Sequence, residues 1–119
     1  MVTSRVGQGY YRQQIINKWE GKCPVSGIDI PSILISSHIV SWSESTDEER
    51  LDVENGILLS PLYDSLFDRH FISFNDDGTL LISGKLNSDQ LTKLNLSKEI
   101  KINVTEGMKK YLKLENQAQ

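Results

Sequence analysis

Apolar residues near the start of the chain recur at helical spacing. Tyr11, Ile15, Ile16 and Trp19 follow a period close to 3.6 residues, and the pattern stops at Gly21. Such a stripe is typical of a helix that covers a core with one face. It predicts an amphipathic first helix over residues 10–19.

Two short apolar runs further along predict a pair of strands. Residues 33–35 follow a proline that blocks a helix, and residues 57–59 follow Asn55-Gly56, a dipeptide common in turns. Runs this short, bounded by turn residues, favour strands over helices. We expect them to pair as a hairpin that is closed by a long loop. Within that loop, Thr46 and Glu49 have capping-box spacing and predict a short helix.

The segment after the second run carries acidic residues at helical spacing. Ser60 can cap a helix and Pro61 suits the first helical position, so a helix is predicted over residues 61–69. Asp64 and Asp68 stand four residues apart, which places both carboxylates on one face of this helix. The apolar positions expected to face inward are Leu62, Leu66 and Phe67.

The rest of the chain mixes strand and helix patterns. Residues 71–74 and 80–82 flank an Asn-Asp-Asp-Gly turn and predict a second hairpin. A short helix is predicted over residues 88–94 and a strand over residues 100–104. The last predicted helix begins at Thr105, and its exposed positions are Lys109, Lys110 and Lys113. The expected fold class is α+β.

Length and composition bound the molecule further. With 119 residues, 38% of them apolar, we expect a single domain over residues 1–119. No run approaches the roughly 20 apolar residues of a membrane span, and the N-terminus lacks the apolar core of a signal peptide. Cys23 is the only cysteine, which excludes an internal disulfide and fits a small buried apolar residue. A cytoplasmic protein with no membrane partner is expected.

The charge is unevenly distributed. The formal charge of −3 disfavours a nucleic-acid partner, yet residues 85–119 hold seven Lys against four acids, whereas residues 1–84 hold six Lys or Arg against twelve acids. One interpretation is an acidic catalytic part followed by a basic segment that contacts phosphate. The other is an ordinary solvated helical face.

Three polar residues stand at the ends of the central elements. His38 follows the first strand run, Asn55 comes seventeen positions later, and Asp64 another nine positions on. Together with residues 6–12, 23–27, 37–42 and 66–74, they resemble the HNH endonuclease family, in the subgroup found in bacterial restriction and defence proteins. The resemblance covers about residues 5–82, with a motif core over residues 33–69.

This resemblance implies a ββα-metal fold with an additional hairpin and flanking helices. His38 matches the histidine that activates water, and an imidazole with a pKa near 6.5 suits that role. Asn55 matches the residue that braces the loop. Asp64 matches the ligand of a divalent metal ion, Mg²⁺ or Mn²⁺, and a carboxylate suits a hard cation.

Other residues are weaker candidates. Asp68 could add a metal ligand, although pairing with an arginine is as plausible. Candidate contacts to the substrate are Tyr63, Arg12, Arg69, Lys109 and Lys110. Taken singly, each residue has an ordinary structural interpretation, such as turn chemistry for Asn55 or a helix N-terminal acid for Asp64.

The sequence departs from the family pattern at three positions. Ser37 stands where many members have an aspartate ligand, Tyr63 where many have histidine, and His70 where glycine is common. Two functions therefore remain open. The first is a metal-dependent endonuclease acting on DNA, with RNA less favoured, in restriction or phage defence, as a homodimer or within a larger polypeptide. The alternative is an inactive HNH-fold module that binds nucleic acid or protein.

Overall fold

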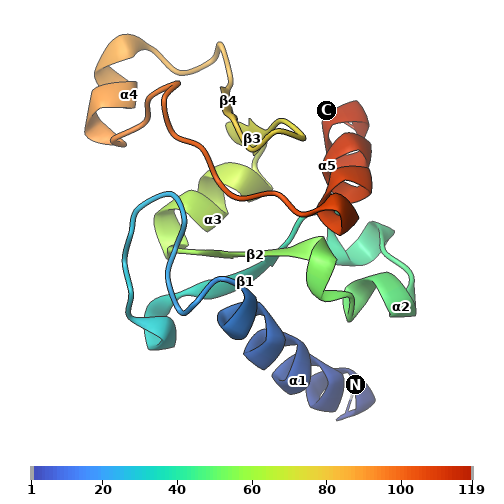
Figure 1. The fold of residues 1–119 in the computed structure, drawn as a ribbon. Helices are drawn as coiled ribbons and strands as arrows, with labels where there is room; N and C mark the ends of the chain where they lie inside the picture. The colour runs from blue at the N-terminus through green and yellow to red at the C-terminus, as the bar shows by residue number, and fades with distance from the viewer. Residues whose placement is uncertain (1, 119) are drawn as a thin grey trace.

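The first helix is longer than its apolar stripe. The computed structural model describes residues 2–118, with side chains from residue 9 to residue 117, and α1 spans Val2–Lys18 (Figure 1). Tyr11 and Ile15 are fully buried, as the periodicity predicts. The apolar stripe predicts the later turns of α1 but not where the helix begins. The side chains of the motif at residues 6–8 lie outside those described.

The central hairpin is present, but its first strand begins later than predicted. β1 (Ile35–His38) pairs with β2 (Gly56–Leu59) in antiparallel register, with Ile35 opposite Leu59 and His38 opposite Gly56. The strand predicted at residues 33–35 was therefore wrong by two positions. Pro31–Ile33 forms the short 3₁₀ helix η1, because proline at the first position favours a helical turn.

A long loop joins the two strands. It contains η2 (Trp42–Glu44), α2 (Asp47–Arg50) and η3 (Val53–Asn55). The capping box at Thr46 is confirmed, since Thr46 and Glu49 exchange side-chain and backbone hydrogen bonds. The turn predicted at Asn55-Gly56 is wrong, because Gly56 has an extended φ of −161° and opens β2.

The helix after the hairpin is confirmed to within one residue. α3 spans Pro61–Asp68, with Ser60 at its N-cap position, but the Ser60 side chain makes no capping hydrogen bond, so the predicted hydroxyl cap is wrong. Its inward face differs in one position, because Leu62 is 49% exposed while Tyr63 is buried. Tyr63 stands three residues before Leu66 and four before Phe67, so these three side chains share the buried face of α3.

The later elements follow the pattern with one exception. β3 (Ile72–Phe74) pairs with β4 (Leu80–Ile82), and α4 (Ser88–Lys93) and α5 (Glu106–Ala118) are confirmed. The strand predicted at residues 100–104 is wrong. This segment runs extended beside the second hairpin with an isolated bridge from Lys101 to Thr79, because its contact with the turn at Gly78 is too short for a ladder.

The central hairpin lies between two helices. Contacts join α1 to both strands from one side and α3 to both strands from the other, and Figure 1 shows this layering, with α5 closing over η3. All four residues of β2 are buried. The two strands and α3 give the ββα arrangement that the sequence predicts. Over residues 2–118, no helix is long and apolar enough to cross a membrane.

Candidate functional site

His38 ends β1 with its ring held from three directions. The ring stacks on Tyr11, with centroids 4.5 Å apart and an angle of 8° between the planes, and it meets the edge of Trp42 at a centroid distance of 5.7 Å. Its Nε2 lies 2.8 Å from the carbonyl oxygen of Arg50. These contacts fix the orientation of the imidazole.

The contact with Arg50 also selects the tautomer of His38. A carbonyl oxygen only accepts hydrogen bonds, so in the neutral ring Nε2 carries the proton and Nδ1 is the free acceptor. Burial lowers the pKa of His38 below its ordinary value, and the hydrogen bond to Arg50 opposes that change only in part. The ring is therefore neutral near pH 7 and able to take a proton at Nδ1.

Asn55 is fully buried, and its amide joins two parts of the loop. Its Oδ1 accepts a hydrogen bond from the backbone N–H of Val40 at 2.9 Å, and its Nδ2 donates to the carbonyl of Glu49 at 3.0 Å. Val40 follows His38 by two residues, and Glu49 directly precedes Arg50. The amide thus fixes both the strand end that carries His38 and the carbonyl that holds its ring.

Asp64 meets Ser37, not His38. The Ser37 hydroxyl donates to Oδ1 of Asp64 across the space between β1 and α3. Successive side chains of a strand point to opposite faces, so Ser37 faces α3 while the ring of His38 faces α1. Because Ser37 directly precedes His38, this bond holds the Asp64 carboxylate beside the end of β1 that carries His38.

A cavity brings His38 together with Asp68. It measures about 280 Å³ and opens beside the end of β1. Its lining residues are His38, Ile39, Val40, Ser41, Glu44, Phe67, Asp68, His70, Leu114 and Glu115. Asp64, one turn earlier on α3, is not among the described lining residues. The carboxylates give this cavity a negative lining.

The acidic residues of α3 suit a hard divalent cation. Within the described part of the chain, no three His, Cys, Asp or Glu side chains gather into a group that could hold a metal ion. Mg²⁺ nevertheless keeps several waters and is commonly bound by one or two carboxylates plus a substrate phosphate. Half-buried Asp64 and exposed Asp68 offer that donor set. The carboxylates around the cavity would repel a phosphodiester that entered without a cation.

Tyr63 and Arg12 are engaged in packing contacts. Tyr63 is buried, and its hydroxyl donates to the carbonyl of Leu94 at 2.7 Å, which argues against contact with a phosphate. Arg12 donates through Nη2 to the carbonyl of Pro31 at 2.7 Å. Arg69, at the C-terminal end of α3, is exposed.

The predicted lysines of α5 lie at the surface. Lys109 approaches Glu106, with 3.2 Å between Nζ and Oε2, and Lys110 lies over the ring of Tyr111 at 4.9 Å from its centroid. Both side chains are exposed. Neither contact is strong enough to prevent them from turning toward a phosphate.

His70 occupies a backbone conformation that glycine prefers. Its φ is +64°, which explains why glycine is common at this position. Its Nδ1 lies 3.2 Å from Oε1 of the buried Glu115, so the imidazole ties the end of α3 to α5. This contact accounts for His70 as a packing residue beside the cavity.

Sequence reasoning missed the residues that hold His38. Trp42 and Arg50 lie in the loop, and the guanidinium of Arg50 packs 4.4 Å from the Trp42 ring centroid while its Nε donates to the Trp42 carbonyl. Tyr11 was assigned only to the buried face of α1. The helical period places Tyr11 on the core, but no sequence signal says which side chain it touches there.

The central part of the chain matches a known protein family. Residues 23–75 match the model of a family described as HNH endonuclease. This segment contains β1, the loop, β2, α3 and β3. No curated protein matches the chain at a significant level.

Proposed function

Because residues 23–75 form an HNH endonuclease domain, a member of a phosphodiester hydrolase family, we propose that this chain is a divalent-metal-dependent endonuclease that cuts DNA. HNH nucleases act on nucleic acids and generally use a divalent metal ion. The preference for DNA over RNA, for Mg²⁺ or Mn²⁺, and a cytoplasmic role in restriction or phage defence are the finer parts of the proposal.

The contact between Nε2 of His38 and the Arg50 carbonyl is the observation that carries this proposal. A general base must present an unprotonated nitrogen in a defined direction. The contact between Nε2 and the Arg50 carbonyl leaves Nδ1 as that nitrogen, and the stacked Tyr11 ring limits rotation. Asn55 supports both elements of this arrangement through its amide.

The proposed reaction is hydrolysis of a phosphodiester by water. Nδ1 of His38 accepts a proton from the attacking water, whose oxygen forms a bond to phosphorus as the bond to the leaving oxygen breaks. Asn55 keeps the strand end and the Arg50 carbonyl in place during this transfer. Asp64 and Asp68 would hold the metal ion, and Ser37 orients Asp64 by donating to its carboxylate. When bound, the ion supplies positive charge that stabilises the developing negative charge on the phosphate.

Cleavage of supercoiled plasmid tests the proposed function. We expect nicking with Mg²⁺ or Mn²⁺, loss with EDTA, and a rate lowered by about 10²- to 10⁴-fold in His38→Ala. His70→Ala is the matched control, because His70 is the chain's other histidine and lies beside the same cavity. An equal loss in both variants would contradict a specific role for His38.

The second candidate is a module that binds nucleic acid without cutting it. The observation that favours it is Ser37, which offers Asp64 a neutral hydroxyl where many HNH members have a second carboxylate. Calorimetric titration with Mn²⁺ separates the two: the nuclease should bind Mn²⁺ and lose affinity in Asp64→Asn. DNA binding with no metal binding and no cleavage would establish the module.

We propose further that residues 1–119 act as one unit. The motif core at residues 33–69 contributes His38, Asn55 and Asp64, but α1 and α5, which hold the loop between the strands, lie outside it. Whether the unit works as a homodimer or within a larger polypeptide is tested by sedimentation of the purified chain with and without DNA.

A further inference from the structure

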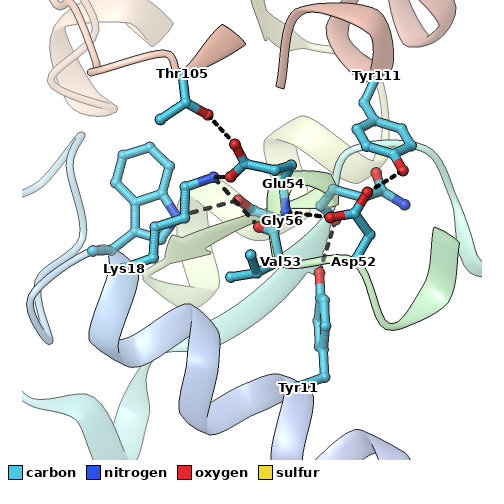
Figure 2. A network of polar contacts seen from close by, with 10 residues as sticks. Tyr11, Lys18, Asp52, Val53, Glu54, Gly56, Thr105 and Tyr111 are labelled. Atoms are coloured by element: carbon cyan, nitrogen blue, oxygen red, sulfur yellow. Dashed lines mark hydrogen bonds and ion pairs between the residues drawn. The ribbon is translucent and has the colours of Figure 1, made fainter. Parts of the chain in front are cut away.

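One side chain outside the matched family segment touches both His38 and Asn55. Tyr11 lies on α1, twelve residues before the segment 23–75 begins, and is fully buried. Its ring is stacked almost parallel on the imidazole of His38, and its hydroxyl donates to the carbonyl oxygen of Asn55 at 2.7 Å. Figure 2 shows Tyr11 rising from α1 toward the segment between Asp52 and Gly56.

The hydroxyl and the ring of Tyr11 act on different parts of the site. The hydroxyl fixes the backbone of Asn55, whose side-chain amide already holds the loop around His38. Burial raises the pKa of Tyr11, so the phenol stays protonated and remains a donor. The ring covers one face of the imidazole, where water would otherwise lie. A single residue therefore restrains both the base and the residue that braces it.

The segment next to Asn55 has other supports that do not involve Tyr11. Asp52 accepts a hydrogen bond from the backbone N–H of Glu54 at 3.0 Å and another from the hydroxyl of Tyr111 at 2.5 Å (Figure 2). Glu54 in turn accepts from Lys18 at 2.6 Å and from Thr105 at 2.7 Å. These bonds hold η3 between α1 and α5, so changing Tyr11 need not release the loop.

Among the side chains that the structure describes, no other ring stacks on His38 as Tyr11 does. Trp42 meets the imidazole with its edge at a wider centroid distance, and it is itself 38% exposed. Arg50 restrains one ring nitrogen but leaves rotation about that contact open. A stacked aromatic ring removes this remaining freedom, because the imidazole cannot turn without breaking the parallel contact.

We propose that Tyr11 is a positioning residue that keeps the imidazole of His38 turned with Nε2 on the Arg50 carbonyl and Nδ1 free for the proton. This inference rests on the proposed function, since it concerns the same base. It adds that α1 completes the site, so the matched segment alone lacks part of the machinery. Tyr11 acts through His38 and touches no substrate atom in this assignment.

Three variants separate the ring from the hydroxyl and from general packing. Tyr11→Leu removes the stacked ring, Tyr11→Phe keeps it and removes only the hydrogen bond to Asn55, and Ile15→Ala damages the same buried face of α1. Ile15 is the matched control because it is fully buried and packs with Tyr11 against Gly56.

We expect kcat for plasmid cleavage to fall about 30-fold in Tyr11→Leu, with KM unchanged, because a catalytic group that is misplaced by about 1 Å can lower the rate by up to about 10²-fold. Tyr11→Phe should recover kcat to within about threefold of the unmutated chain, since the ring supplies the positioning. Ile15→Ala should lower the melting temperature without lowering kcat. Equal losses of kcat in Tyr11→Leu and Ile15→Ala, or no loss in Tyr11→Leu, would overturn the proposal.

A spectroscopic measurement tests the assignment without relying on activity. The chain has only two histidines, so the ¹⁵N imidazole resonances of His38 can be assigned by comparison with His38→Ala. At neutral pH the unmutated chain and Tyr11→Phe should show a single tautomer with the proton on Nε2, whereas Tyr11→Leu should show averaged tautomers. Mixed tautomers in the unmutated chain would overturn the proposal even if Tyr11→Leu does not fold. If no DNA is cut, this signature still decides the role of Tyr11 while the proposed function fails separately.

Discussion

Gly56 is a glycine because of its neighbours, not because of its backbone. Its φ of −161° is extended and open to any residue. A Cβ at this position would overlap the hydroxyl of Tyr11 and the Cδ1 of Ile15, both of which press on β2 from α1. The absent side chain is what lets α1 approach the strand that pairs with His38.

Gly56→Ala should therefore destabilise the chain. We expect a loss of about 1–3 kcal/mol, typical of an overpacked core, and a displaced Tyr11 ring. Gly9→Ala is the opposite control, because Gly9 lies in α1 and no described atom lies within 4 Å of its would-be Cβ, so an alanine there should stabilise α1 by about 0.5–1 kcal/mol. Urea denaturation of both variants measures the difference, and a neutral Gly56→Ala would contradict the close approach.

The pH dependence of cleavage should follow His38. Burial lowers the pKa of this imidazole, and the base works only when it is deprotonated, so the active form persists to lower pH than for an ordinary histidine. We expect kcat/KM to rise with pH through a midpoint below the ordinary value of 6.5 and then level off. A rate profile measured with saturating metal at each pH checks this; a midpoint above 6.5 would mean that another group governs the rate.

Among the elements, η3 is the junction at which α1 and α5 meet the loop. Glu54 joins all three, since it accepts hydrogen bonds from Lys18 of α1 and from Thr105 at the start of α5. Gly107 approaches Glu54 so closely that a Cβ there would overlap the carboxylate. Figure 2 shows Lys18 and Thr105 converging on Glu54, within the segment from Asp52 to Gly56. The geometry around Asn55 therefore depends on two helices that are far apart in the sequence.

Glu54→Gln should weaken this junction in a pH-dependent way. Burial raises the pKa of Glu54, but the hydrogen bonds from Lys18 and Thr105 outweigh it and lower the pKa below 4.5. A lowered pKa in the folded state means that the stabilisation is complete above pH 4.5 and is lost as the pH falls through the folded-state pKa. At pH 7 we expect the variant to be about 1 kcal/mol less stable, with the gap closing in acid.

Thermal melts at neutral and acid pH measure that gap. Glu106→Gln serves as the control, because Glu106 pairs with Lys109 at the surface with a side chain that is 85% exposed. Such an ion pair contributes little, so its removal should leave the melting temperature unchanged at both pH values. A gap for Glu54→Gln that stays constant into acid would rule out the ionised carboxylate as its cause.

The sequence predicted helices and strands correctly where they depend on interactions between residues that are close in the chain. The capping box at Thr46 depends on bonds within a few residues and appeared as predicted. α3 begins at Pro61 as predicted, but the Ser60 side chain makes no capping hydrogen bond. The prediction of a strand at residues 100–104 is wrong, because the apolar pattern favours a strand even where the neighbouring segment forms only an isolated bridge with it. Tyr63 turned inward in place of Leu62, which only the position of α3 against the hairpin decides.

Across the whole molecule, the candidate site is assembled from segments that the sequence treats separately. The order and spacing of His38, Asn55 and Asp64 sufficed to indicate an HNH domain, which the family match bears out. Spacing could not say that Ser37 would take the face toward Asp64, because a shift of one residue in strand register reverses every side chain. Nor could it assign Tyr11 to His38, a contact made between α1 and the hairpin.

The salt dependence of DNA binding can show which lysines contact the phosphates of a duplex. We compare two basic surfaces in the described part of the chain: the lysines of α5 at Lys109 and Lys110, and a second cavity of about 310 Å³ whose rim includes Lys22 and Lys101. Since the net charge is −3, binding must rely on local clusters, and each phosphate contact contributes about 0.9 to the slope of log K against log salt.

Replacing both lysines of the surface that binds DNA should therefore reduce the slope of log K against log salt by about 2. Replacing both lysines of the other surface should leave the slope unchanged. We expect the larger change in Lys109→Ala with Lys110→Ala, because α5 also supplies Leu114 and Glu115 to the cavity beside His38 and so runs along the site. Fluorescence anisotropy with a short duplex over a range of salt concentrations gives both slopes. A reduced slope only in Lys22→Ala with Lys101→Ala would instead place the duplex over the second cavity. Trp19 lines that cavity, and its indole donates a hydrogen bond to the carbonyl of Gly56. DNA would then reach His38 from the α1 side of the hairpin, the side that its ring faces.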